Sequence, residues 1–150
     1  MKKTCRLYVM LVAIAFSVVS VVAQQRRTLI DDNWEFAREG HPVVKVNLPH
    51  DWSIQGVPVA DEPAGNDGGY YPTGKGVYRK VLHLKTKSAD RRYSLYFEGV
   101  YMNAEVVVNG TSTGTQHYGY SSFLRDVTEL LREGDNEVVV RVDNSQQKNC

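Results

Sequence analysis

The stretch Asn136-Glu-Val-Val-Val-Arg-Val-Asp143 decides the fold of this 150-residue chain. Val138, Val140 and Val142 alternate in it with charged residues at positions 137, 141 and 143. Successive side chains of an extended chain point to opposite faces, so this pattern puts valine on one face and charge on the other. It predicts a half-buried β-strand, with one face in a core and the other in water.

The rest of the chain, worked outward from this strand, predicts an all-β domain. Asn109-Gly110 is the dipeptide that favours a tight hairpin turn, because both residues accept positive φ. Residues 126–132 alone have helical spacing, with Asp126 as a candidate N-cap and Gly134 as the stop. Short strands separated by Gly, Pro and Asn turns favour an antiparallel sandwich. The strands are expected at residues 34–36, 43–46, 77–84, 93–98, 104–109 and 136–143.

Residues 1–23 are predicted to be a signal peptide. The basic start Met1-Lys-Lys-Thr-Cys-Arg6 precedes an apolar run over 7–22, which ends at the small residues of Val21-Val-Ala23. That order is typical of secretory signals. We therefore expect one domain, residues 24–150, that is secreted or periplasmic in a bacterium and has no stable membrane anchor once the signal is cleaved. An uncleaved anchor is the alternative, since the apolar run is just long enough to span a bilayer.

Charge and cysteine content exclude several classes of function. The chain carries 18 basic and 17 acidic residues, and cleavage would remove Lys2, Lys3 and Arg6 to leave a formal net charge of −2. Such a domain has no basic surface for nucleic acid. Cleavage would also remove Cys5, and Cys150 alone can form neither an internal disulfide nor a zinc site. We therefore expect no metal and no cofactor.

The acidic residues do not predict a catalytic pair. Glycoside hydrolysis and general acid–base chemistry both need two carboxylates placed across a substrate. The acids at 31–32, 61–62 and 98 are scattered among turns and strand faces, and no spacing brings two of them together. We interpret them as solvated surface groups and turn formers. No catalytic residue is assigned.

The tripeptide His50-Asp51-Trp52 has two interpretations. A histidine beside an acid could act as a base with its orienting partner, although neighbours on a strand point to opposite faces. No serine or cysteine in a nucleophile motif lies nearby. We favour a structural role, in which Trp52 lies in the core and Asp51 is a buried, hydrogen-bonded residue that ties down a turn.

Two aromatic segments are candidates for ligand contact. The interruption over residues 56–76 is long for a compact domain, and it carries Tyr70 and Tyr71. A second segment, His117-Tyr-Gly-Tyr120, also falls between strands. A tyrosine ring can stack on the C–H face of a sugar, although packing at the edge of a sandwich explains such residues equally well. Asn109-Gly-Thr111 matches a glycosylation pattern, but the hairpin turn already accounts for it.

Six motifs in order resemble one known family. They are Leu48-Pro-His-Asp-Trp-Ser53, Gly76-Val-Tyr-Arg-Lys80, Phe97-Glu-Gly-Val-Tyr-Met-Asn-Ala-Glu-Val-Val-Val-Asn-Gly110, Gly119-Tyr-Ser-Ser-Phe123, Asp126-Val-Thr-Glu-Leu-Leu131 and Asn136-Glu-Val-Val-Val-Arg-Val-Asp-Asn144. Together they resemble the amino-terminal sugar-binding domain of family 2 glycoside hydrolases, with the β-galactosidase branch as the best match. The resemblance covers residues 28–149.

The resemblance implies a galactose-binding-like jelly roll that lacks its last strand. It also implies a longer parent protein, in which an immunoglobulin-like domain and a TIM barrel follow. The family's catalytic glutamates lie on that barrel, so this chain alone is expected to be inactive. The parent would hydrolyse terminal β-galactosides in carbohydrate breakdown with retention, which needs two carboxylates about 5 Å apart.

The family's first domain contributes a loop that touches the terminal sugar. By position the segment 65–71 resembles this loop, which makes Asn66, Asp67, Tyr70 and Tyr71 the candidate substrate-binding residues. Relatives in the family act on galactosides, glucuronides or mannosides, and the residues that discriminate them lie mostly on the barrel. The sequence therefore leaves the sugar open.

Two other classes of function remain. The chain could be a stand-alone carbohydrate-binding module or lectin, with Tyr70, Tyr71, His117 and Tyr118 as a stacking platform. It could also be a sandwich that makes only protein contacts. Turnover of a β-galactoside, glycan binding and the reading frame beyond residue 150 would distinguish these classes from the hydrolase domain.

Overall fold

The computed structural model describes residues 26–61, 65 and 69–145, and within them the domain is built from antiparallel strands without an α-helix. By contact the chain divides into residues 1–30 and 31–150, and the described strands all belong to the second unit. The predicted signal peptide lies outside the described residues. Among the residues that are described, no helix is long and apolar enough to cross a membrane.

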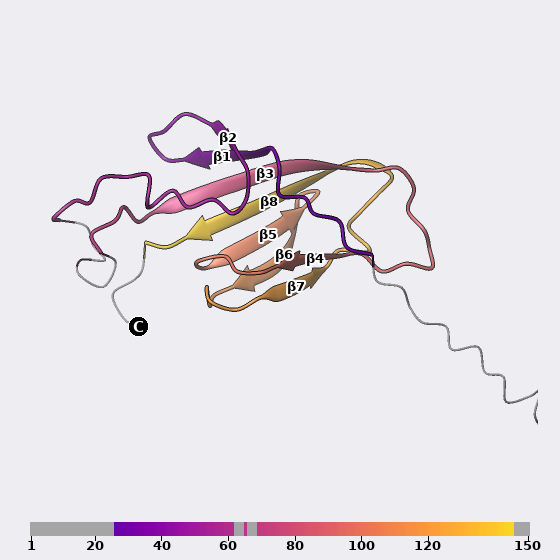
Figure 1. The fold of residues 1–150 in the computed structure, drawn as a ribbon. Helices are drawn as coiled ribbons and strands as arrows, with labels where there is room; N and C mark the ends of the chain where they lie inside the picture. Colours follow the sequence, from indigo (N-terminus) through magenta and orange to yellow (C-terminus); the bar gives the residue numbers. More distant parts are fainter. Residues whose placement is uncertain (1–25, 62–64, 66–68, 146–150) are drawn as a thin grey trace, which may run out of the picture. The chain divides into compact units, whose positions relative to one another are not determined.

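Eight strands in the described part form two antiparallel sheets (Figure 1). The larger sheet has six strands in the order β2-β1-β3-β8-β5-β6, and the smaller sheet pairs β4 with β7. The strands are β1 Trp34–Arg38, β2 Val44–Val46, β3 Lys75–Leu84, β4 Ser94–Phe97, β5 Ala104–Val108, β6 Thr111–Gln116, β7 Phe123–Asp126 and β8 Gly134–Asp143.

Strand β8 is at the centre of the large sheet because it pairs with β3 on one side and β5 on the other. Its register aligns Val140 with Tyr78 of β3 and with Val106 of β5, so these three side chains share one face. Val138, Val140 and Val142 are all buried, as the alternation predicted. The predicted strand and its buried valine face are therefore confirmed, but Val139 on the opposite face is buried as well, beside the buried Val107 of β5, so that face is only partly in water. The large sheet is assembled around this strand.

The core lies between the valine face of the large sheet and the aromatic face of the small one. Leu95 and Phe123 are the buried residues of β4 and β7, and the Phe123 ring stacks on Phe97 with 4.7 Å between centroids. The opposite face of the large sheet carries cross-strand ion pairs, such as Arg79–Glu137 and Arg141–Glu105. This division keeps charge in water and removes apolar side chains from it.

Three elements differ from the sequence prediction. Residues 126–132 are a single turn and not a helix, because the Val127 carbonyl accepts from both Leu130 and Leu131 before the chain enters β8. Asp126 caps this turn, since its carboxylate accepts from the Thr128 amide at 2.9 Å. Strand β6 was not predicted, because Thr111–Gln116 is polar and forms the edge of its sheet. Strand β7 was not predicted either, because its four residues, Phe-Leu-Arg-Asp, are too few to show alternation. The two-residue turn at Asn109-Gly110 that leads into β6 is confirmed, with positive φ at both residues.

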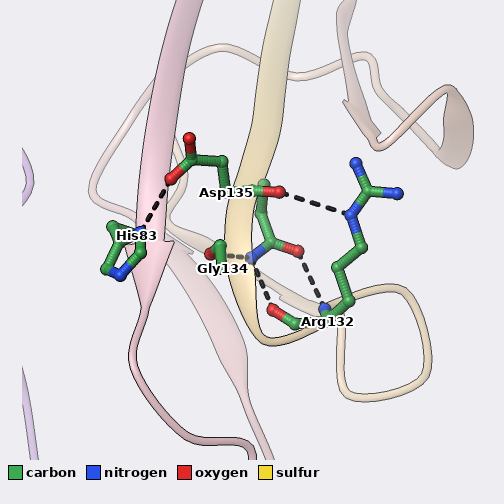
Figure 2. A network of polar contacts seen from close by, with 5 residues as sticks. His83, Arg132, Gly134 and Asp135 are labelled. Carbon is green, nitrogen blue, oxygen red and sulfur yellow. Dashed lines mark hydrogen bonds and ion pairs between the residues drawn. The ribbon is translucent and has the colours of Figure 1, made fainter.

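Asn136 is completely buried at the start of β8 and joins three segments of the chain. Its side-chain oxygen accepts from the Arg132 amide at 2.8 Å and from the Asn109 side chain at 2.9 Å. Its side-chain nitrogen donates to the carbonyls of Arg132 and Gly134. Figure 2 shows Arg132 and Gly134 in this network, with the exposed pair His83–Asp135 beside them. Four hydrogen bonds thus satisfy a side chain that would otherwise be costly to bury.

We predict that Asn136→Ala lowers the free energy of unfolding by roughly 2 to 4 kcal/mol, because it leaves buried donors and acceptors of two neighbouring turns without partners. Chemical denaturation of the whole chain measures this loss. The matched control is Asp135→Asn, which removes only the charge of a surface pair with His83 and should cost less than about 1 kcal/mol. Equal losses in the two variants would contradict the assigned role of Asn136.

Candidate functional site

The loops at one end of the sandwich form the candidate site. Strand β3 begins there at Lys75, which is paired with Asp143 near the end of β8. Strand β5 begins and β6 ends at the same edge, since Ala104 is paired with Gln116. Three connections therefore meet at this end, the β2–β3, β4–β5 and β6–β7 loops (Figure 1). We call this the loop end.

The His50-Asp51-Trp52 segment belongs to the first part of the β2–β3 loop, and its two rings pack against aromatic residues of the large sheet. Trp52 is buried and stacks on Phe36 with 5.4 Å between ring centroids. His50 contacts the same phenylalanine, and its Nδ1 lies 2.9 Å from the hydroxyl of Tyr78. Asp51 was expected to be buried, but it is exposed, because its carboxylate caps a solvent-facing turn by accepting from the Ser53 amide at 2.8 Å.

Burial controls the ionisation of this cluster. It lowers the pKa of His50, and the nearby negative charge of Asp51 opposes that shift only in part. Burial, assisted by the same charge, raises the pKa of Tyr78 well above its usual value. Both rings are therefore neutral near pH 7 and share a hydrogen bond, which suits a packing role.

We predict that the stability of the domain falls as the pH drops from about 7.5 to 5.5, in part through His50. Because the folded pKa of His50 is lowered, the unfolded chain takes up this proton first, and unfolding is favoured below the unfolded value of about 6.5. The free energy of unfolding should depend less steeply on pH in His50→Asn. The control His41→Asn, in the exposed β1–β2 turn, should keep the original slope. An unchanged slope in His50→Asn would contradict this assignment.

The β2–β3 loop is anchored to the end of β8. The side-chain oxygen of Asn144 accepts from the backbone amide of Gly74 at 2.7 Å, and the backbone amide of Asn144 donates to the Gly74 carbonyl at 3.0 Å. Arg38 of β1 donates to the Thr73 carbonyl at 3.0 Å. Asn144 is buried, so these contacts are shielded from water. The loop is therefore fixed at Gly74, where it returns to the sheet, by the side chain of Asn144, which lies 70 residues further along the sequence.

Within this loop, the backbone of Tyr70 is held on both sides. Its amide donates to Gly65 at 3.0 Å, and its carbonyl accepts from Val59 at 2.9 Å. The side chains of Tyr70 and Tyr71 are each 39% exposed, so the loop presents two rings to solvent. Of the predicted sugar-contacting residues these two are described, whereas Asn66 and Asp67 lie outside the described residues.

Asp143 is also at the loop end, and it is bound by structural partners. Burial by itself would raise its pKa, but hydrogen bonds from Ser145 and the charge of Lys75 outweigh this and hold the pKa below its usual value. Its Oδ2 lies 3.6 Å from Nζ of Lys75. The group is thus a fixed carboxylate, and its neighbours are cationic or hydrogen-bonding groups.

Sequence reasoning missed how the other loops contribute. Asn103 of the β4–β5 loop donates to the Asp143 carbonyl at 3.1 Å, and its side-chain oxygen lies 2.9 Å from Nδ1 of His117. Tyr101 and Tyr120 approach within 5.2 Å between ring centroids. Tyr120 belongs to the second aromatic segment named from the sequence, whereas Tyr101 was not named as a site residue. The motif Tyr-Met-Asn at 101–103 was the available signal, since it lies between two predicted strands.

Other parts of the domain do not add a competing site. A shallow pocket of about 400 Å³ lies beside Arg92 and Asp126. Two of the five charged residues that line it are already paired with each other, as Nε of Arg92 is 3.2 Å from the Asp126 carboxylate. Among the residues described, no three His, Cys, Asp or Glu side chains group together as a metal site would require.

The two antiparallel sheets define an all-β domain that carries exposed tyrosines in its loops. The family model for "Glycosyl hydrolases family 2, sugar binding domain" matches residues 20–149. The chain therefore belongs to family 2 of the glycosyl hydrolases as its sugar-binding domain.

Relatives with similar sequences are long glycosidases. The chain is 37% identical over 147 residues to the beta-galactosidase BoGH2A of Bacteroides ovatus, covering 90% of this chain and 17% of that protein. It is 34% identical over 134 residues to a beta-glucuronidase of Bacteroides fragilis, covering 86% and 18%. The chain thus spans less than a fifth of the length of these relatives.

Solved structures agree with the fold. A family 2 glycosyl hydrolase from Bacteroides cellulosilyticus superimposes with a TM-score of 0.73 at 32% identity, covering 80% of this chain and 18% of that one. A beta-glycosidase from Bacteroides vulgatus gives 0.69 at 34% identity, covering 77% and 17%. The antiparallel β architecture predicted from the sequence is therefore confirmed.

Proposed function

We propose that this chain is the sugar-contacting domain of an exported hydrolase of the β-galactosidase type. The observation that carries the proposal is the β2–β3 loop, which Asn144 and Arg38 fix at its return point while Tyr70 and Tyr71 remain exposed. A pre-formed loop loses little conformational freedom when a ligand binds, so its contacts contribute to affinity.

In this proposal the domain binds and other parts of the parent protein cleave. The β2–β3 loop, including Asn66 and Asp67, would touch the terminal sugar of a β-galactoside, and the two catalytic carboxylates would come from a barrel that follows an immunoglobulin-like domain. The sandwich would then be a galactose-binding-like jelly roll completed by a further strand. Similarity to BoGH2A favours a galactoside, and similarity to beta-glucuronidases keeps a glucuronide as the competing substrate.

A stand-alone carbohydrate-binding module is the second candidate function. The observation that favours it is the exposure of Tyr118 at 63%, because a module without a barrel needs solvent-facing rings of its own. Sugar binding without any sugar-cleaving partner would separate this candidate from the hydrolase domain.

We predict that the purified chain binds methyl β-galactoside weakly and does not hydrolyse a chromogenic β-galactoside. Saturation-transfer NMR should detect binding of the galactoside to the chain. Tyr71→Ala should weaken this binding about tenfold, a ratio that corresponds to about 1.4 kcal/mol for the lost contact with the ring. Tyr96→Ala, which truncates an exposed tyrosine in the middle of β4, is the matched control.

Each result of this experiment has a distinct meaning. Preference for methyl β-glucuronide over the galactoside would replace the β-galactosidase type with a glucuronidase type. Binding of neither sugar would overturn the sugar-contacting role. Turnover by the purified chain that is absent from a mock purification would show that catalytic carboxylates lie within these 150 residues.

Export is part of the proposal and rests on the amino-acid pattern of residues 1–23. If the signal is cleaved after Ala23, amino-terminal sequencing of the protein recovered from a periplasmic or culture fraction should begin at Gln24. A protein that stays in the membrane fraction with Met1 at its start would contradict cleavage.

A further inference from the structure

Three tyrosines from two loops gather in a second aromatic cluster at the loop end. Tyr101 belongs to the β4–β5 loop, whereas Tyr118 and Tyr120 belong to the β6–β7 loop. The Tyr120 ring lies 5.2 Å from Tyr101 and 5.9 Å from Tyr118, between centroids, at interplanar angles of 56° and 64°. Tyr118 is 63% exposed and Tyr120 is 78% exposed. We call these three residues the tyrosine cradle, because the Tyr120 ring lies at a tilted angle to both of the others and two of the three rings are exposed to solvent.

Close packing between the two loops positions the tyrosines of the cradle. Gly119, between the two exposed tyrosines, is buried against Tyr101. A Cβ added to Gly119 would lie 2.9 Å from the Tyr101 Cα and 2.3 Å from its ring, so only glycine permits this approach. The side chain of Gln116 lies 3.4 Å from the Ser121 hydroxyl across the base of the same loop. Both ends of the loop are therefore held while two rings point outward.

A polar group with a defined role flanks the cradle. Because the side-chain nitrogen of Asn103 donates to the Asp143 carbonyl, its side-chain oxygen is left to accept from Nδ1 of His117. Neutral His117 then carries its proton on Nδ1 and presents Nε2 as an acceptor. His117 is exposed, so this acceptor can meet the hydroxyl group of a ligand.

The cradle and the Tyr70-Tyr71 loop are connected through the end of β8. Asn103 binds the carbonyl of Asp143 and the amide of Asp143 donates to Met102 at 3.1 Å. The next residue, Asn144, holds Gly74 at the return of the β2–β3 loop. One short backbone segment therefore fixes both aromatic surfaces at the same end of the domain.

We propose that the tyrosine cradle is a second sugar-binding surface, which takes further units of an oligosaccharide whose terminal unit lies at the Tyr70-Tyr71 loop. The C–H face of a pyranose is apolar with slightly positive hydrogens, and it stacks on the negative face of an aromatic ring, while its hydroxyls need acceptors at the rim. Tyr118 and Tyr120 supply the rings and His117 supplies the acceptor. This inference rests on the proposed function, and it extends the substrate class from a single terminal sugar to a chain of sugars.

The test compares galactose with β-1,4-galactotetraose as ligands of the whole chain, by calorimetry. The tetraose should bind more tightly than galactose. The double variant Tyr118→Ala/Tyr120→Ala should lose about tenfold in tetraose affinity, a ratio that corresponds to about 1.4 kcal/mol. Its affinity for galactose should remain unchanged. The double variant Tyr118→Phe/Tyr120→Phe keeps the rings, and it should retain tetraose binding.

Controls separate this inference from a folding defect and from the proposed function. Tyr96→Ala should leave binding of both ligands unchanged, and thermal melts should show that the alanine double variant remains folded. Full tetraose affinity in the folded alanine variant, or equal affinity of the unsubstituted chain for galactose and the tetraose, would overturn the cradle. Loss of tetraose affinity without any effect of Tyr71→Ala on galactose would support the cradle and refute the role of the β2–β3 loop.

Discussion

Strand β8 depends on a buried asparagine at each end, and most of the domain depends on β8. Asn136 and Asn144 are the buried polar residues within the described part of the chain, at 0% and 5% exposure. A buried amide is stable only when its donors and acceptors are bonded, so each asparagine fixes the backbone around it. Asn136 ties the strand to the turn before it and to the β5–β6 hairpin, and Asn144 ties it to the β2–β3 loop. Between them, the valines align the two halves of the large sheet.

This arrangement explains how hydrogen bonds to one central strand hold the loops at one end of the described domain. The loops at one end are fixed by hydrogen bonds at the end of β8, and the valines of β8 are buried in the core. Asp143 and Asn144 connect two of these loops, since Asp143 accepts from Asn103 of the β4–β5 loop and Asn144 accepts from Gly74 of the β2–β3 loop. Rigid presentation of exposed rings lowers the conformational cost of binding, which is the physical property that a sugar-contacting domain needs.

Much of the fold could be predicted because strand alternation is a local signal. Strands β4 and β8 were found from apolar residues at every second position, β5 from its β-branched residues, and the β5–β6 turn from Asn109-Gly110, while β1, β2 and β3 were also placed within a few residues of their observed bounds. The failures have local causes too. Polar edge strand β6 has no apolar face to detect, and the turn after β7 contains apolar residues at helical spacing although only one turn of chain is available before β8. Asp51 was placed in the core because Trp52 follows it, yet its carboxylate caps a turn in water.

By itself, the sequence determined that this is an antiparallel β domain of a sugar-hydrolase family with aromatic residues in its loops. Those features depend on the spacing of neighbouring residues, which the chain carries in any conformation. Only the tertiary structure decided which loops share an end, that Asn144 holds Gly74, and that Tyr101 meets Tyr120. Such contacts join residues far apart in the chain, and they depend on the order and register of the strands. A shift of one residue in register would have turned the same side chains to the opposite face.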